Sequence, residues 1–246
     1  MNITMIGRIT DCVLLAYRTP AASVAHLLPC GLDLVTHGQW AFWNIVACRV
    51  ESMRPSFFPR WIGNSYHHVA YRLYVRAHAQ AEVLEGLYFA RSDADNLPVC
   101  LLGNRATDFR FHKAVIGLSV SEEMVSLSTS GTRDGAGDAE LHAGIGEPTL
   151  TSESCFESYA LARQFLKYRP LALSPDRRRR RIKVAEVFRD EAAWREWPLT
   201  VSKARWGFFD RLAQHDAQLE LATRVEPLDY RWKLGRSCAL RSPPSG

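Results

Sequence analysis

The sequence of 246 residues has no long hydrophobic run. No apolar stretch approaches the roughly 20 residues that a membrane-spanning helix needs. The N-terminal segment carries Arg8 and Asp11 where a signal peptide would have an uninterrupted apolar core. We therefore expect no transmembrane segment, no membrane partner and a cytoplasmic location.

Cysteine is also sparse, and the six cysteines form no Cys-x-x-Cys pair. A disulfide scaffold is therefore not expected. The sequence shows no zinc-ligand spacing, no glycine-rich phosphate-binding loop and no Ser-His-Asp set. The adjacent residues His67 and His68 would point to opposite faces of a strand, so they cannot share one metal ion. The sequence predicts no metal and no cofactor.

The formal net charge is +5, and much of the excess lies in one run, Arg177 to Arg181. The chain lacks the interleaved basic and aromatic residues that nucleic-acid-binding domains use, so we expect no nucleic-acid partner. We interpret the arginine run as a solvated loop or strand edge, with a polyanion contact as the alternative. A hydrophobic content of 47% supplies an ordinary globular core.

Alternating and β-branched patterns predict strands at 9–17, 40–50, 66–76, 86–91, 181–188 and 217–225, and more strands between 117 and 151. Helices are predicted at 20–28, 98–105 and 152–168, the second capped by Asp93, Asp95 or Asn96. Many strands with few helices, no repeat and no linker favour a single α+β domain over residues 1–241. Residues 242–246 are predicted to be a disordered tail.

The strand at 66–76 is the most informative segment, because successive side chains point to opposite faces. One face is mostly apolar. The other groups His68, Arg72 and Tyr74 with Ala70 and Arg76. A guanidinium suits capture of a carboxylate, and an imidazole can move protons near neutral pH. Periodicity alone leaves open whether this face lines an interior or meets solvent.

Residues 66–116 resemble acetoacetate decarboxylase in the order and spacing of several elements. The matching elements are Tyr66-His-His68, Val75-Arg76, Gly86-Leu-Tyr88, the acidic turn at 93–96, Gly103 and the segment 109–114. The chain as a whole is similar to a bacterial YqjF-like family of unknown function, domain of unknown function 2071, in the acetoacetate-decarboxylase-like superfamily. The resemblance runs from Tyr17-Arg-Thr-Pro20 to residues 156–168 of the last predicted helix. It implies a mostly antiparallel, cone-shaped β-barrel with a few flanking helices and an interior ligand, and it leaves homo-oligomer formation open.

The departures from that family bear on chemistry. Its two lysines, of which the first forms a Schiff base, fall here on Phe111 and His112, and lysine comes one residue later, at Lys113. A one-residue slip turns a strand side chain to the other face. The family's acidic residue falls on His68. The resemblance therefore implies that decarboxylation through a Schiff base is disfavoured.

We interpret the chain first as a protein with an interior pocket for a small acid or carbonyl compound, and the sequence leaves open whether it is an enzyme. Its candidate catalytic residues are His68, His112 and Lys113, and its candidate ligand-binding residues are Arg72, Tyr74, Phe109 and Phe111. A first alternative is a lyase-type enzyme with Lys113 as the Schiff-base nucleophile. A second is a non-enzymatic binding or assembly module that uses the arginine run and the aromatic loop of Phe57, Phe58 and Trp61.

Overall fold

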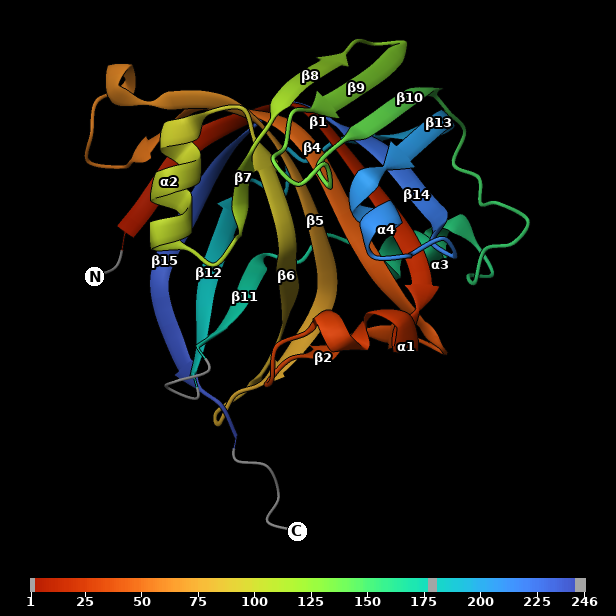
Figure 1. Ribbon diagram of the computed structural model, residues 1–246, viewed down its shortest axis with the longest axis horizontal. Coiled ribbons are helices and arrows are strands. Elements are labelled where there is room, and N and C mark those ends of the chain that lie inside the picture. The colour runs from red at the N-terminus through yellow and green to blue at the C-terminus, as the bar shows by residue number, and fades with distance from the viewer. Residues whose placement is uncertain (1–2, 177–180, 242–246) are drawn as a thin grey trace.

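Seven strands close a barrel within the part of the chain that a computed structural model describes, residues 3–176 and 181–241 (Figure 1). Around the wall they are β4 (Trp40–Pro55), β5 (Asn64–His78), β6 (Val83–Ala94), β11 (Leu171–Asp176), β12 (Arg181–Arg189), β15 (Leu228–Ala239) and β1 (Ile3–Pro20). Strand β1 closes the ring by pairing with β4. The expected antiparallel barrel with few helices is confirmed.

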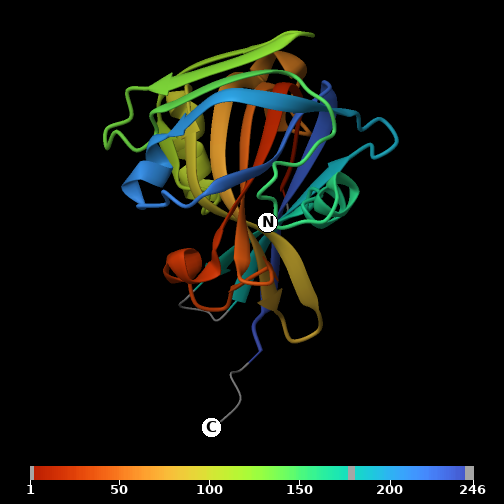
Figure 2. The same ribbon diagram turned by 90° about the vertical axis from the view of Figure 1, so that its right-hand side faces the viewer.

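A second layer of strands continues from β1 and folds over the outside of the barrel (Figures 1 and 2). It consists of β14 (Gln218–Val225), β13 (Glu196–Trp206), β10 (Ala139–Ile145), β9 (Met124–Ser130) and β8 (Val115–Val120). The outward side chains of the barrel, including Trp43 and Tyr71, pack under this layer against Phe208 and Phe209 of α4 (Gly207–Arg211). The main apolar core therefore lies between the barrel wall and the second layer.

The barrel wall is weakest between β6 and β11. These strands are parallel and share a single residue pair, Leu87 with Ala172. A Cβ on Gly86 would lie 2.5 Å from the carbonyl oxygen of Leu171, so the bare backbone lets the two strands approach. Beyond this point β7 (Phe111–Lys113) replaces β11 as the partner of β6. Helix α2 (Leu97–Ala106) packs on β6 and β7.

The remaining described elements are short. They are the helices α1 (Ala21–Val24), η1 (Ala25–Leu27), η2 (Arg60–Ile62) and α3 (Tyr159–Phe165), and the two-residue strands β2 (Asp33–Leu34) and β3 (Thr36–His37). No helix among the described residues is long and apolar enough to cross a lipid bilayer.

The helix expected at 152–168 is wrong in length, since only Tyr159–Phe165 is helical. The preceding residues are held instead by the buried carboxylate of Glu220, which accepts hydrogen bonds from the Ser154 hydroxyl and the Cys155 backbone amide. The helix begins only after Ser158, whose side chain caps it. A tertiary contact therefore outweighs the local helical pattern.

The cap of α2 is Asn96, whose Oδ1 accepts a hydrogen bond from the Val99 amide at 3.1 Å. The two aspartates that were alternatives for this cap bind elsewhere, Asp93 to Arg91 and Asp95 to His67.

The arginine run falls mostly on residues 177–180, outside the described residues, and so does the tail at 242–246.

Candidate functional site

A cavity of about 460 Å³ occupies the interior of the barrel. This volume is within the range of small-molecule sites. Its wall is mostly apolar and aromatic, with side chains from every barrel strand and from α2. The aromatic members are Tyr66, Phe89, Phe109, Phe111, Tyr168, Trp194, Tyr230 and Trp232, together with Phe58 at the rim.

Strand β5 places His68 and Arg72 on the cavity wall, while Val69 and Tyr71 between them face the core under the second layer. This division follows from the alternation of side chains along a strand. Tyr74 shares the strand face of Arg72 but does not line the cavity. It is buried in a separate apolar cluster that includes Phe42, where its hydroxyl donates to the carbonyl oxygen of Leu166 at 2.7 Å.

Arg72 is a buried cation that has no counter-ion in the part of the chain that the structure describes. The residue is 7% exposed, and none of the described carboxylates lies within ion-pair distance of it. Burial lowers the pKa of its guanidinium, and the groups that oppose this are tyrosine and cysteine side chains rather than carboxylates. An uncompensated buried charge is costly and buried charges in proteins are normally paired, so a ligand that brings the opposite charge would be favoured beside Arg72.

The guanidinium of Arg72 is held in position by Asn44. Its Nη2 donates to Asn44 Oδ1, and Asn44 Nδ2 donates to the Tyr74 hydroxyl at 2.9 Å. On the other side, the guanidinium carbon lies 5.6 Å above the Phe89 ring, which stacks on Phe109 at 4.1 Å. This support fixes the orientation of the charge and leaves the cavity side of the group open.

His68 lies between two aromatic rings, with centroid distances of 6.2 Å to Tyr66 and 5.2 Å to Phe111. Its Nε2 is buried and has no hydrogen-bond partner among the described residues. Burial, with a smaller contribution from Arg72, lowers the pKa of the imidazole to about 3. His68 is therefore neutral near pH 7 and presents an unused polar atom.

The pKa of His68 predicts a loss of stability on acidification. Below pH 6.5 the unfolded chain binds a proton at this residue, whereas the folded chain does not until about pH 3. The unfolded state binds more protons over that window, so the free energy of unfolding falls as the pH falls. Between pH 6.5 and about pH 4 the expected loss is roughly 3 kcal/mol.

Urea unfolding at a series of pH values measures this loss, and His68→Gln is expected to remove it. The control is His26→Gln, at an exposed histidine of η1, which should keep the wild-type dependence. Equal slopes for wild type and His68→Gln would contradict the prediction.

Phe109 and Phe111 line the cavity because the chain between them makes a sharp bend. Arg110 has a φ of +56°, which is uncommon for a residue other than glycine. Asn104 of α2 holds the next residue through both of its amide atoms, accepting from Phe111 N at 2.7 Å and donating to Phe111 O at 2.8 Å. A Cβ on Gly103 would lie 2.6 Å from the Phe111 ring, so this glycine makes room for it.

His112 and Lys113 are exposed and do not line the cavity. The Lys113 ammonium donates to the carbonyl oxygen of Ala114 at 2.8 Å, at the outer end of β7. The chain's other lysines are also exposed and outside the cavity wall; they are Lys167, Lys183, Lys203 and Lys233.

Among the described residues of the wall, cysteine and tyrosine side chains and the hydroxyl of Thr107, which donates to Gly103 O at 2.8 Å, supply the remaining nucleophilic atoms. Burial raises the pKa of the Cys48 thiol to about 12 and that of the Cys12 thiol well above its usual range. It also raises the pKa of the Tyr168 hydroxyl to about 12. These groups are neutral at pH 7, so the wall offers hydrogen bonds rather than a thiolate or phenolate.

The described part of the cavity wall contains no aspartate or glutamate, and Arg54 and Arg169 add to its positive charge. Arg169 also lies 3.6 Å from Glu85 Oε2. Sequence reasoning missed Tyr168, Arg169, Trp194 and Tyr230, because these residues show no local pattern and reach the cavity only through the closing of the barrel.

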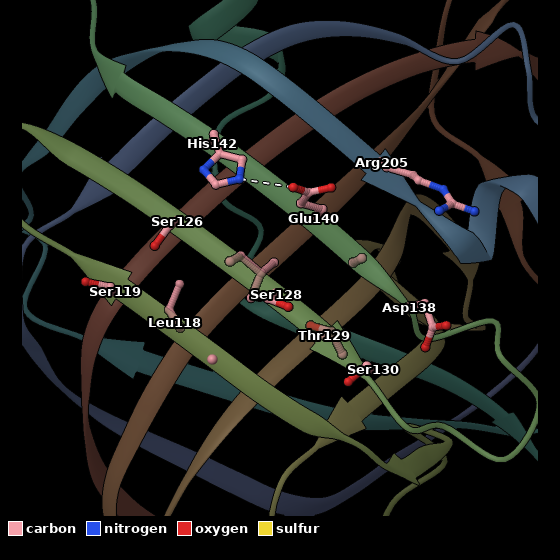
Figure 3. Close-up of a pocket in the computed structure, with 13 residues that line it drawn as sticks. Leu118, Ser119, Ser126, Ser128, Thr129, Ser130, Asp138, Glu140, His142 and Arg205 are labelled. Atoms are coloured by element: carbon pink, nitrogen blue, oxygen red, sulfur yellow. Dashed lines mark hydrogen bonds and ion pairs between the residues drawn. The ribbon is translucent and has the colours of Figure 1, made fainter.

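A second hollow lies on the outer face of β8, β9 and β10 (Figure 3). It is lined by serines and by Glu140, His142 and Arg205. The charged groups already bind one another at the surface, His142 to Glu140 and Lys203 to Glu140. We therefore regard the barrel interior as the stronger candidate. Among residues 3–176 and 181–241, no group of three His, Cys, Asp or Glu side chains is arranged to hold a metal ion.

Comparison with known proteins assigns the chain to a protein family. A family of uncharacterized conserved proteins, DUF2071, matches residues 7–185. No curated protein matches the sequence.

Solved structures share the fold at low identity. Acetoacetate decarboxylase from Legionella pneumophila is 12% identical, with a TM-score of 0.60, over 98% of this chain and 88% of that one. An acetoacetate decarboxylase-like enzyme from Sphingomonas wittichii is 14% identical, with a TM-score of 0.57, over 98% and 94%. The enduracididine biosynthesis enzyme MppR, complexed with the condensation product of pyruvate and imidazole 4-carboxaldehyde, is 12% identical, with a TM-score of 0.57, over 96% and 88%.

Proposed function

Because the chain belongs to the DUF2071 family and has the acetoacetate-decarboxylase-like fold, we propose that its barrel interior binds a small organic acid with an apolar body. The buried, unpaired guanidinium of Arg72 is the observation that carries this proposal. A carboxylate would supply the missing counter-charge in a bidentate geometry. The aromatic wall would surround an arene or an alkyl chain.

His68 is the second polar contact in this proposal. Its free Nε2 accepts a hydrogen bond from a hydroxyl or an enol of the ligand. A bound carboxylate would also favour the protonated imidazole, since a nearby negative charge raises the pKa of a histidine. In a reaction on the bound acid, His68 is thus the group of the wall that exchanges a proton with the ligand.

Imine chemistry has no support in the cavity wall, because the lysines, Lys113 included, are exposed and lie outside it. MppR has been solved in complex with pyruvate and with a condensation product of pyruvate, so a protein of this fold accepts a keto acid. We propose that this chain accepts an acid of that kind, or a larger apolar one, without a covalent bond to lysine.

The test compares acids with their uncharged amides. Thermal unfolding is measured with 3-phenylpropanoate, octanoate and phenylpyruvate, and with 3-phenylpropanamide and octanamide as matched controls. An acid at about 100 times its Kd stabilises the folded state by about 2.7 kcal/mol. That corresponds to roughly 5–10 °C in Tm for a chain of this size. Amides should shift the Tm little, and equal shifts for acids and amides would refute the proposal.

The covalent alternative is tested in the same samples. Phenylpyruvate and borohydride are added together, and the intact mass of the protein is measured. We expect no mass increase on Lys113 or any other lysine. A reduced adduct that disappears in Lys113→Met would instead support the lyase-type enzyme.

A further inference from the structure

The rim of the cavity carries an exposed apolar surface built from two segments. One is the loop 53–64, which contains η2, and the other is α2. Both reach the cavity, the loop through Met53, Phe58 and Ile62 and the helix through Val99 and Leu102. Figure 1 shows the loop and α2 on the same side of the barrel, near the N-terminus. We call these two segments the rim.

The rim exposes side chains that are normally buried. Trp61 is 84% exposed, Phe57 is 69% exposed, and Leu101 and Leu102 of α2 are each 64% exposed. Single exposed apolar residues are ordinary, but a group around the opening of an apolar cavity marks an interaction site.

The charges of the rim have one sign. Arg54 and Arg60 lie on the loop and Arg105 lies at the end of α2, while neither 53–64 nor 97–106, both fully described, contains an acidic residue. Aromatic and aliphatic side chains beside arginine are typical of surfaces that enter the interface of a bilayer. Anionic headgroups attract such arginines.

We infer that the rim docks on a bilayer that contains anionic lipid, with Trp61, Phe57 and Leu101 in the interface and the cavity opening toward the membrane. The sequence predicts no membrane partner because no segment is long and apolar enough to span a bilayer. A rim that lies on the membrane surface needs no such segment. A second copy of the chain fits less well, since a symmetric contact would bring the arginines of two rims together and the two rim segments themselves contain no acid to pair with them.

Docking would also explain where the acid comes from, and in this respect the inference rests on the proposed function. An apolar acid partitions into a bilayer. A cavity that opens against the membrane lets such an acid enter without crossing water, with Arg72 deeper in the barrel to receive its carboxylate. The partner is therefore a lipid surface that holds the ligand.

The experiment is sedimentation of the whole protein with vesicles that carry no added acid. We expect binding to phosphatidylcholine vesicles with about a third phosphatidylglycerol, and much weaker binding to phosphatidylcholine alone or at high salt. Phe57→Ser with Trp61→Ser, and separately Arg60→Glu with Arg105→Glu, should each lower the apparent affinity at least about tenfold. These residues do not line the cavity.

Matched controls are Trp197→Ser and Arg205→Glu, both on β13 away from the rim, which should bind vesicles like wild type. Absent vesicle binding, or binding that the rim variants share with the controls, overturns the inference. A dimer in gel filtration that Trp61→Ser dissociates, without vesicle binding, assigns the rim to a second copy and also overturns it. Acid binding is measured separately in solution, where the rim variants should bind acids with wild-type affinity. A failure of the docking inference and a failure of the proposed function therefore appear in different assays.

Discussion

Replacing Arg72 with methionine is expected to lower the affinity for 3-phenylpropanoate about 100-fold or more. Removal of one partner of a buried, hydrogen-bonded charge pair typically costs about 2–5 kcal/mol of binding free energy. Methionine keeps most of the volume of the side chain, so the cavity keeps its shape. The weak affinity for 3-phenylpropanamide should change little, because the amide carries no charge. Isothermal titration calorimetry of both ligands measures the difference.

Arg76→Met is the matched control for this result. Arg76 is on the same strand face, two residues beyond Tyr74, but it pairs with Glu85 at the surface at 2.6 Å and does not line the cavity. Its replacement should leave acid binding unchanged. If both variants lost the same affinity, or if Arg72→Met kept it, the carboxylate would bind elsewhere.

Replacing Asp93 with alanine is expected to cost about 3–5 kcal/mol of unfolding free energy, the usual penalty for breaking a buried ion pair. Asp93 is fully buried, and both of its oxygens accept from Arg91 Nε, at 3.0 and 2.9 Å. The same guanidinium donates through its other two nitrogens to Asp134, at 2.7 and 3.0 Å. This network ties β6 to the turn between β9 and β10, and without Asp93 it retains a buried cation with half its partners.

Urea unfolding at pH 7 measures this effect, and Asp93→Asn provides a milder variant that keeps the shape of the side chain. Asp229→Ala, which breaks an exposed pair with Arg8, is the control and should have little effect because solvent screens such pairs. A loss for Asp93→Ala no larger than that of the control would show that the network adds nothing to the fold.

The strand at 66–76 shows what a local pattern can predict. Its alternation correctly separates two sets of side chains, because the period of a strand is a property of the backbone alone. The pattern does not tell which set faces the ligand, since both faces of β5 are buried: Tyr71 on one and Tyr74 on the other are fully covered. That choice depends on the second layer, which covers one face and leaves the other to enclose the cavity.

Two long strands, β13 and β15, were not predicted. Their outward positions carry charged residues such as Lys203, Arg205 and Lys233, so the apolar signal is diluted. The C-terminal cavity residues were missed for a different reason. Trp194 and Tyr230 line the same cavity as the β5 residues only because β12 and β15 complete the ring, and no spacing along the chain encodes that arrangement.

The two faces of β5 have different roles, since one packs in the main core and the other contributes to the cavity wall. Odd-numbered positions such as Val69 and Tyr71 are committed to the core, so most changes there would be removed by loss of folding. The even-numbered positions His68 and Arg72 line the cavity, so a change of side chain there alters the cavity wall and not the main core. Substitutions on alternate residues of this one strand would therefore change the lining of the cavity, while the intervening residues keep the barrel intact.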